Sequence, residues 1–195
     1  DVQVVNTSDA DIVGAFASKD VRNVVTWNPL LDEVENTPGA KLVFDSSKIP
    51  GHIKDLTLVN SKTLADNPAF GKAVVGAWYE VMGIIASDTK EGADARAFLG
   101  KASGTDQAGY ESQLKGMKMF WKPTDSLSFI ESEEAYEAMD SVRHFSFDHG
   151  LLGEGASSVD FIGISMPNGK LLGDAGNTKL RFDTTYMQMA ADGKL

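Results

Sequence analysis

The sequence predicts an α/β protein, and three observations lead to this prediction. Residues 1–55 alternate short runs of strand-forming residues with helix-start signals. Most of the chain after residue 60 has apolar residues at helical spacing. Near the C-terminal end, a turn signal separates two short apolar runs, as in a β-hairpin. With 195 residues, the chain is long enough to form one large domain or two small lobes.

The composition argues against several classes of function. The formal net charge of −10 at pH 7 argues against binding to the phosphate backbone of nucleic acids, which needs a basic surface. The chain has no cysteine, which rules out disulfides, thiolate nucleophiles and thiolate metal ligands but does not fix the cellular compartment. No apolar run approaches about 18 residues, so a membrane span is not expected.

The first elements are predicted to be a strand and a capped helix. The valines within residues 2–5 predict the strand, and this alternating start without an initiator methionine indicates a processed or truncated N-terminus. Ser8 or Asp9 is expected to cap the helix, because a short side-chain oxygen can accept the free N–H groups of the first turn. The apolar face of this helix is expected to consist of Ile12, Val13 and Phe16.

The rest of the N-terminal part is organised around Val24–Trp27, a run of strand-forming residues. Asn28 and Pro29 end this strand, since proline cannot donate to a sheet ladder but fits the first turn of a helix, with Asn28 as the cap. Trp27 and Asn28 are therefore expected at the carboxyl end of a strand, where ligands bind in open α/β sheets. An indole ring beside an amide and free helix N–H groups suits a small polar ligand. Packing of Trp27 in the core is the alternative interpretation.

Four further elements complete the N-terminal alternation. In order, they are a short helix at 30–34, a strand at 41–44 followed by Asp45, Ser46 and Ser47, a linker at 49–52, and a strand at 56–59. Because the last strand alternates poorly, we expect it to be buried on both faces.

The remainder is predicted to be mostly helical. Asn67 and Pro68 form a strong helix start, and a long apolar stripe that includes Trp78 follows. A helix at 131–147 is expected to end at Gly150, because glycine readily adopts the left-handed conformation that closes many helices. The inward face of this helix is expected to contain Ala135, Met139, Val142 and either His144 or Phe145. Other helices are expected to begin at Asp88, Thr105 and Pro123, and Trp78 and Trp121 are expected in the core.

The C-terminal tail is predicted to contain a hairpin. Residues 159–164 alternate as a strand, Pro167–Gly169 is a turn signal, and Leu171–Leu172 forms the returning strand. Residues 180–182 are expected to be extended, and residues 185–191 to form a last helical turn.

The sequence contains no pattern of residues typical of a catalytic site or a cofactor site. The hydrolase pattern Gly-x-Ser-x-Gly and the phosphate-binding loops are absent. His144 and His149 are five residues apart, a spacing that a helix does not place on one face, and His52 is distant in the sequence. We therefore interpret the histidines as structural rather than metal ligands, and we expect no metal and no cofactor.

Several stretches, taken in order and spacing, carry a resemblance to a known family. These stretches are Ser8–Phe16, Val24–Pro29, Val43–Ser47, Asp55–Asn60 and the helix start at Asn67–Pro68. They resemble the substrate-binding proteins of ABC importers of the nitrate, sulfonate, taurine and thiamine-precursor type. The tail, with residues 145–150 and 186–193, resembles a subgroup encoded beside urea carboxylase genes. The likeness extends over nearly the whole chain.

The resemblance implies a type II periplasmic binding protein fold, in which two α/β lobes joined by a hinge hold a ligand. Family members are considerably longer, so the resemblance also implies that an N-terminal segment of the same protein is missing. Residues 1–48 would then be the remainder of lobe two, residues 49–55 the hinge, and residues 56–195 the C-terminal part of lobe one. The shortage of predicted strands relative to helices leads to the same expectation.

The resemblance also implies ligand contacts and a function. The implied contacts are Thr26, Trp27 and Asn28, then Asp45 and Ser46, and then Ser8 and Asp9 if the strand before them is parallel. Trp27 with Asp45 would suit a small cation or a neutral urea-like molecule, whereas a helix N-terminus at Asn28 would suit an anion such as a sulfonate or carboxylate. The association with urea carboxylase genes favours a small nitrogen compound.

The function implied is that of a periplasmic receptor without catalytic activity. It would capture a small polar, nitrogen-containing solute by hinge closure and dock on the membrane permease of an ABC importer. Two alternatives stay open. One is an enzyme on the same fold, of the type that acts in pyrimidine synthesis for thiamine. The other is the effector-binding domain of a regulator.

Overall fold

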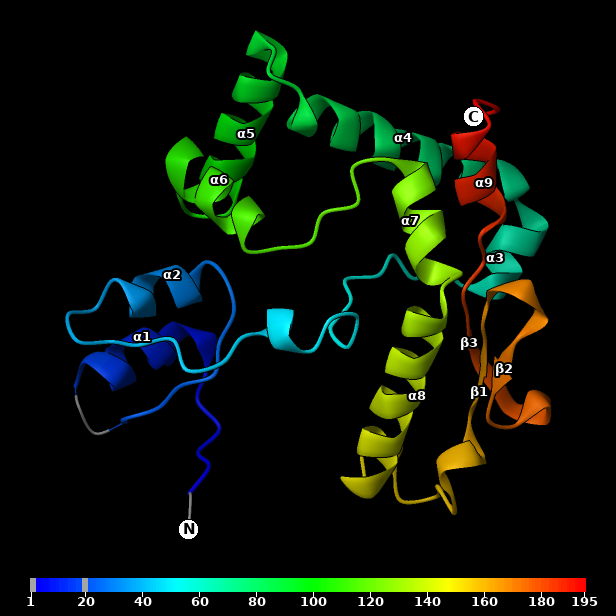
Figure 1. Cartoon of the computed structure of the whole chain (residues 1–195), viewed down its shortest axis with the longest axis horizontal. Coiled ribbons are helices and arrows are strands. Elements are labelled where there is room, and N and C mark those ends of the chain that lie inside the picture. The colour runs from blue at the N-terminus through cyan, green and yellow to red at the C-terminus, as the bar shows by residue number, and fades with distance from the viewer. Residues whose placement is uncertain (1–2, 19–20) are drawn as a thin grey trace. The chain divides into compact units, whose positions relative to one another are not determined.

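The chain folds as a mixed α/β protein that is mostly helical. The computed structural model describes residues 3–18 and 21–195, and over these ranges it contains nine α-helices and one small three-stranded sheet (Figure 1). The predicted α/β class is therefore confirmed.

The chain divides into two compact units, each built from two separate stretches of sequence. The first unit comprises Asp1–Phe44 and Ser87–Met119, and the second comprises Asp45–Ala86 and Phe120–Leu195. The predicted hinge, residues 49–55, lies within the second unit.

The helices of the first unit form two packed pairs. One pair is α1 with α2, and the other is α5 with α6. Their bounds are α1 Asp9–Ala17, α2 Leu30–Glu35, α5 Lys90–Ala102 and α6 Gln107–Lys115. The Thr89 side chain, rather than that of the predicted Asp88, caps α5 by accepting from Gly92 N at 3.2 Å. The α6 helix begins two residues later than predicted, because Asp106 is its cap and accepts from Gly109 N at 2.8 Å.

A charged network connects α5 to α6. Arg96 Nε donates to Glu111 Oε1 at 2.8 Å, and Arg96 Nη1 donates to the carbonyl of Ser87, also at 2.8 Å. Gln107 Nε2 donates to the same carboxylate oxygen of Glu111 at 2.9 Å. The hydrogen bonds from Gln107 and Arg96 lower the pKa of Glu111, because they stabilise its charged form.

The predicted N-terminal strands do not form in the structure. None of the predicted segments lies in a helix or strand of the described structure. These segments are residues 24–27, 41–44 and 56–59, together with residues 3–5 of the predicted first strand. Val2, also in that prediction, lies outside the described residues. A strand requires a neighbour for its ladder, and no ladder to these segments is found in the described parts of the chain. Most of their apolar side chains are exposed, and only Val24 and Val59 are partly buried. The burial of both faces expected for 56–59 is therefore not found.

The second unit contains the remaining helices and the sheet. Helices α4, α7 and α9 pack together, and Tyr79 OH on α4 donates to Ser126 Oγ on α7 at 2.8 Å. The bounds of the helices are α3 Ser61–Asp66, α4 Pro68–Ala86, α7 Pro123–Ile130, α8 Glu133–Asp148 and α9 Thr185–Ala191. Helix α4 begins at Pro68 and α9 spans residues 185–191, as predicted. Helix α3, which the Asn60 side chain caps, was not predicted.

The sheet confirms the predicted hairpin. Strand β1 (Gly163–Ser165) lies between β2 (Leu171–Leu172), to which it is antiparallel, and β3 (Thr178–Arg181), to which it is parallel. The strand begins later than predicted, because residues 159–161 form a 3₁₀-helix. Asn168 in the hairpin turn has φ +59°, a left-handed conformation that asparagine tolerates better than most residues.

The main core of the second unit lies where α7 and α8 meet the sheet. Its buried residues are Ile130, Ala135, Met139, Ile164, Met166 and Leu172. Ala135 and Met139 face inward as predicted, but His144 and Phe145 are exposed. The residue in the next position of that inward face is Arg143, only 8% exposed. Gly150, with φ +70°, follows the C-terminal end of α8 as predicted.

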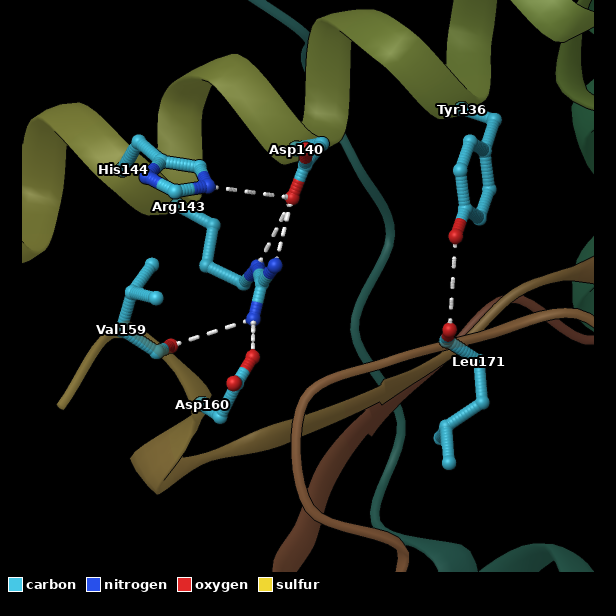
Figure 2. Close-up of polar contacts among 7 residues, drawn as sticks. All are labelled: Tyr136, Asp140, Arg143, His144, Val159, Asp160 and Leu171. Carbon is cyan, nitrogen blue, oxygen red and sulfur yellow. Dashed lines mark hydrogen bonds and ion pairs between the residues drawn. The ribbon is translucent and has the colours of Figure 1, made fainter.

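Arg143 joins α8 to the 3₁₀-helix at Val159–Phe161 (Figure 2). Its Nη2 donates to Asp140 Oδ1 at 2.6 Å, and its Nη1 donates to the carbonyl of Val159 at 3.2 Å and also to the Asp160 carboxylate. His144 Nε2 lies 3.8 Å from the same Asp140 oxygen. A buried guanidinium with these partners is satisfied by the fold itself.

Helix α4 is less buried than its pattern predicts. Trp78 is 53% exposed, Phe70 and Val81 are also exposed, and Met82 and Ile85 are buried. The prediction that Trp78 lies in the core is therefore wrong. Trp121, which was also predicted in the core, is half-buried. No membrane span was predicted from the sequence, but α4 is long and apolar enough to cross a membrane, judged by length and composition alone. Of the 18-residue apolar stretch that meets these criteria, 17% is buried inside the protein. Core helices of soluble proteins meet the same criteria.

We predict that Arg143→Met lowers the free energy of unfolding by about 1–3 kcal/mol, because it leaves two carboxylates and a carbonyl without their donor. Asp140 and Asp160 are 38% and 66% exposed, and water access limits the loss. Denaturant unfolding followed by far-ultraviolet circular dichroism measures the change. The control Lys170→Met removes an ion pair with Glu133 in which both side chains are exposed, and should cost less than about 1 kcal/mol. Equal losses in the two variants would contradict a structural role for Arg143.

We also predict that Glu111→Gln flattens the acid dependence of stability. The pKa of Glu111 is lower in the folded chain than in the unfolded chain, where it is about 4.3. The ionised carboxylate therefore adds to the free energy of unfolding above the unfolded pKa, and this stabilisation is lost as pH falls through the folded pKa. Melting temperatures between about pH 3 and pH 7 should show a lower value for the variant at neutral pH and a smaller decline in acid. Glu137→Gln, in the exposed middle of α8, is the control and should follow the wild type.

Candidate functional site

The candidate site is the end of the irregular segment that precedes α2. Here Trp27 is 63% exposed, while Thr26 and Asn28 on either side are partly buried. Thr26 Oγ1 and Asn28 Oδ1 are inaccessible to solvent, and neither has a hydrogen-bond partner among residues 3–18 and 21–195. An unsatisfied buried polar group costs about 1–3 kcal/mol, so such groups are uncommon and require an explanation. The site thus combines an exposed indole with two oxygens whose hydrogen-bonding capacity is unused.

Asn28 does not cap a helix, which corrects the prediction. Helix α2 begins at Leu30, and Pro29 holds the N-cap position. A capping side chain accepts from amides two or three residues after its own position, and Asn28 lies one residue too early to do so. The carbonyl of Trp27 accepts instead from Leu31 N at 2.9 Å. In the part of the chain that the structure describes, the amide oxygen of Asn28 has no hydrogen-bond partner.

Ser8 and Asp9 lie in the same unit as Trp27, at the start of α1. Ser8 holds the predicted N-cap position, but its side chain does not cap the helix, because its hydroxyl donates to Asp11 Oδ2 at 2.6 Å. Asp9 is exposed in the first turn. The charge of Asp9 and Asp11 suits the positive end of a helix, which is a sufficient structural explanation for both.

Asp45 and Ser46 belong to the second unit. Asp45 caps a 3₁₀-helix (Ser46–Lys48) by accepting from Ser47 N at 2.8 Å, and it also accepts from the Ser47 hydroxyl. These two hydrogen bonds lower the pKa of Asp45, so the carboxylate is ionised near neutral pH. The structure thus places Thr26, Trp27 and Asn28 together, with Ser8 and Asp9 in their unit, and assigns Asp45 and Ser46 to the other unit.

A pocket of about 390 Å³ lies elsewhere in the first unit. It is lined by the C-terminal residues of α1, by Val21 and Arg22, and by the turn at Thr37–Ala40. None of the seven predicted ligand contacts lines it. This pocket was not predicted, because its lining comes from two stretches, residues 16–17 with 21–22 and residues 37–40, that meet only in the folded unit.

The described residues do not form a metal site. No group of three or more histidine, aspartate or glutamate side chains within residues 3–18 and 21–195 could hold an ion. His149 stacks on Phe145 at 4.0 Å between ring centroids, and its Nδ1 lies 2.9 Å from the Phe145 carbonyl. His52 Nδ1 lies 3.2 Å from the Pro50 carbonyl. These contacts are local, and each accounts for its ring as a structural element.

Comparison with protein-family models, with curated proteins and with solved structures finds no match to this chain.

We predict that Thr26→Val leaves the free energy of unfolding unchanged or raises it by up to about 1 kcal/mol, because valine replaces a buried hydroxyl that has no partner. Denaturant unfolding in the absence of added solutes measures this change. The control Thr57→Val replaces an exposed hydroxyl and should change the same quantity by less than about 0.5 kcal/mol. Destabilisation by Thr26→Val of more than about 1 kcal/mol would show that the hydroxyl has a partner within the protein.

Proposed function

We propose that the chain is part of an extracytoplasmic receptor that delivers a small polar, nitrogen-containing solute to an ABC importer. The observation that carries this proposal is the exposed Trp27 ring between two buried oxygens without partners, Thr26 Oγ1 and Asn28 Oδ1. The resemblance of the sequence to ABC-importer receptors adds the transport context. A type II periplasmic binding protein fold, a membrane permease as partner and a periplasmic location belong to the same proposal.

The unpartnered oxygens favour one class of solute. An amide oxygen only accepts hydrogen bonds, and a hydroxyl both accepts and donates. Both oxygens are closed to solvent in this structure, so the proposal requires a local opening of the segment, after which a solute with N–H groups can satisfy both of them. The flat face of an indole attracts cations and stacks on planar groups. Urea-like and guanidinium-like molecules meet both conditions.

An anionic solute is less well supported. An anion would bind to the free N–H groups of a helix that begins at Asn28. Helix α2 begins at Leu30 and has six residues, and the Asn28 side chain does not cap it. Acceptor oxygens also repel the negatively charged oxygens of a sulfonate or carboxylate. We therefore favour a neutral or cationic nitrogen compound.

The two alternatives predict different observations. An enzyme of the thiamine-pyrimidine type would need a nucleophile or metal set, and turnover of its substrate would identify it. A regulator would need a DNA-binding segment joined to this chain, whereas an exported precursor would favour the receptor. The acidic charge of −10 gives this chain itself little affinity for DNA.

We predict that Trp27→Ala weakens solute binding by about fivefold to thirtyfold, because stacking on an indole face is worth about 1–2 kcal/mol. Isothermal titration calorimetry with urea, methylurea, guanidinium, taurine and acetate at millimolar concentration identifies the class. A ligand at 100 times its dissociation constant should also stabilise the wild type by about 2.7 kcal/mol.

Trp78→Ala is the matched control, since Trp78 is also a tryptophan exposed by about half but lies on α4 in the second unit. It should bind the same compound as tightly as the wild type. Preference for taurine or acetate would contradict the solute class. Equal weakening in both variants would contradict the site.

A further inference from the structure

The turn between β1 and β2 contains an asparagine that is followed by a glycine. Of the eight asparagines in the sequence, only Asn168 precedes glycine, and the others precede threonine, valine, serine or proline. Asn168 and Gly169 are both exposed. A Cβ atom added to Gly169 would have no neighbour within 4 Å, and glycine itself has none to shield its backbone. The peptide nitrogen of Gly169 is therefore less hindered than that of any residue following the other asparagines.

The side-chain amide of Asn168 is not held by the fold. Among residues 3–18 and 21–195, the Asn168 side chain makes no hydrogen bond. Two other asparagines provide a contrast. Asn177 Nδ2 donates to the carbonyl of Phe161 at 2.7 Å. Asn60 Oδ1 accepts from Lys62 N at 2.9 Å. The Asn168 amide can therefore rotate toward the backbone, whereas the amides of Asn60 and Asn177 are fixed in other positions.

The backbone of the closed turn keeps the Asn168 amide away from the next peptide nitrogen. Asn168 has φ +59° and ψ +26°, and no other non-glycine residue in the described ranges has a positive φ. At this ψ the Gly169 nitrogen lies on the side of the backbone opposite the Asn168 side chain, so a ring through both requires rotation about ψ. Two hydrogen bonds of the turn oppose this rotation: Met166 N donates to Lys170 O at 2.9 Å, and Lys170 N donates to Pro167 O at 3.3 Å.

We propose that Asn168 is a site of spontaneous deamidation, and that opening of the β1–β2 turn sets the rate of the reaction. When the turn opens, the Gly169 nitrogen reaches Cγ of Asn168 and attacks it. The site lies entirely within the second unit. The inference goes beyond the receptor function and does not depend on it.

The reaction consumes only water. The Gly169 nitrogen loses its proton to hydroxide and forms a bond to Cγ of Asn168. The bond from Cγ to Nδ2 breaks, and Nδ2 leaves as ammonia with a proton taken from water, which restores the hydroxide. One water molecule then opens the resulting cyclic imide. Cleavage at Cγ gives aspartate, and cleavage at the backbone carbonyl gives isoaspartate, in which the main chain runs through Cβ and Cγ.

The two products differ in their effect on the hairpin. Aspartate keeps the backbone of asparagine and also tolerates a positive φ. Isoaspartate lengthens the main chain by one carbon atom within the turn that aligns Ile164 with Leu172. Met166 and Leu172 on either side of the turn are buried in the core. Tyr136 OH on α8 donates to the carbonyl of Leu171 at 3.4 Å (Figure 2), so displacement of β2 also disturbs its contact with α8.

Incubation of the protein at mildly alkaline pH, followed by peptide mapping with mass spectrometry, tests the proposal. We expect Asn168 to be converted at least about tenfold faster than Asn60 or Asn177, because glycine follows it. The rate should rise with pH, since the attacking nitrogen must lose its proton. In guanidinium chloride that unfolds the chain, Asn168 should be converted at least about tenfold faster than in the folded protein, because no turn has to open.

Three forms of the protein separate the reaction from its effect on stability. Asn168→Gly lacks the reacting amide and should show no conversion at this position. Asn168→Asp reproduces the aspartate product, and both variants should melt within about 2 °C of the unmodified protein because glycine and aspartate tolerate a positive φ. The isoaspartate form, separated by chromatography from incubated wild type, should melt at least about 3 °C lower.

Several results would overturn the proposal. If Asn168 stays intact in the folded protein while the unfolded chain is fully converted, the turn does not open far enough to react. Equal rates in the folded and unfolded chains would show that the turn does not control the reaction. Conversion of Asn60 or Asn177 as fast as Asn168 would contradict the choice of site. An isoaspartate form that melts like the wild type would contradict the effect on the hairpin.

Discussion

A strand is stable only when its backbone has a neighbour to pair with and its side chains have a surface to cover. The two units differ in how far they meet this constraint. In the second unit, β1 has a partner on each side, and the core formed with α7 and α8 covers the sheet. In the first unit, helices α1 and α2 pack together, but the segments they connect remain unpaired and exposed. The absence of the predicted strands at 24–27 and 41–44 follows from this contrast.

Elements with local signals could be predicted from the sequence. Pro68 begins α4, Gly150 follows α8, and the turn at Pro167–Gly169 connects β1 to β2. Each depends on the backbone preferences of a few consecutive residues, which the sequence shows directly. Strands at 24–27, 41–44 and 56–59 would each need a partner strand that is distant in the sequence. The side chains suit a sheet, but their pattern does not reveal whether a neighbour is present.

Burial of polar groups is the other property that sequence analysis missed. Arg143 follows Ala135 and Met139 at a spacing of four, so its position on the inward face could have been found from helical periodicity alone. We predicted Val142 and either His144 or Phe145 on that face instead, and of these only Val142 is partly buried. Thr26 and Asn28 were selected by resemblance, whereas the lack of partners for their oxygens depends on the packing around them. Hydrogen-bonding satisfaction is a property of the folded neighbourhood.

The division of the chain has a consequence for how its parts can be separated. The polypeptide passes from one unit to the other three times, after Phe44, after Ala86 and after Met119. A protease that cuts at one of these crossings leaves the units joined by the other two. Neither unit can be obtained by shortening the chain from one end, because each consists of two stretches interrupted by the other. Genetic dissection of this protein therefore requires excision and rejoining, for example with a short linker in place of residues 87–119.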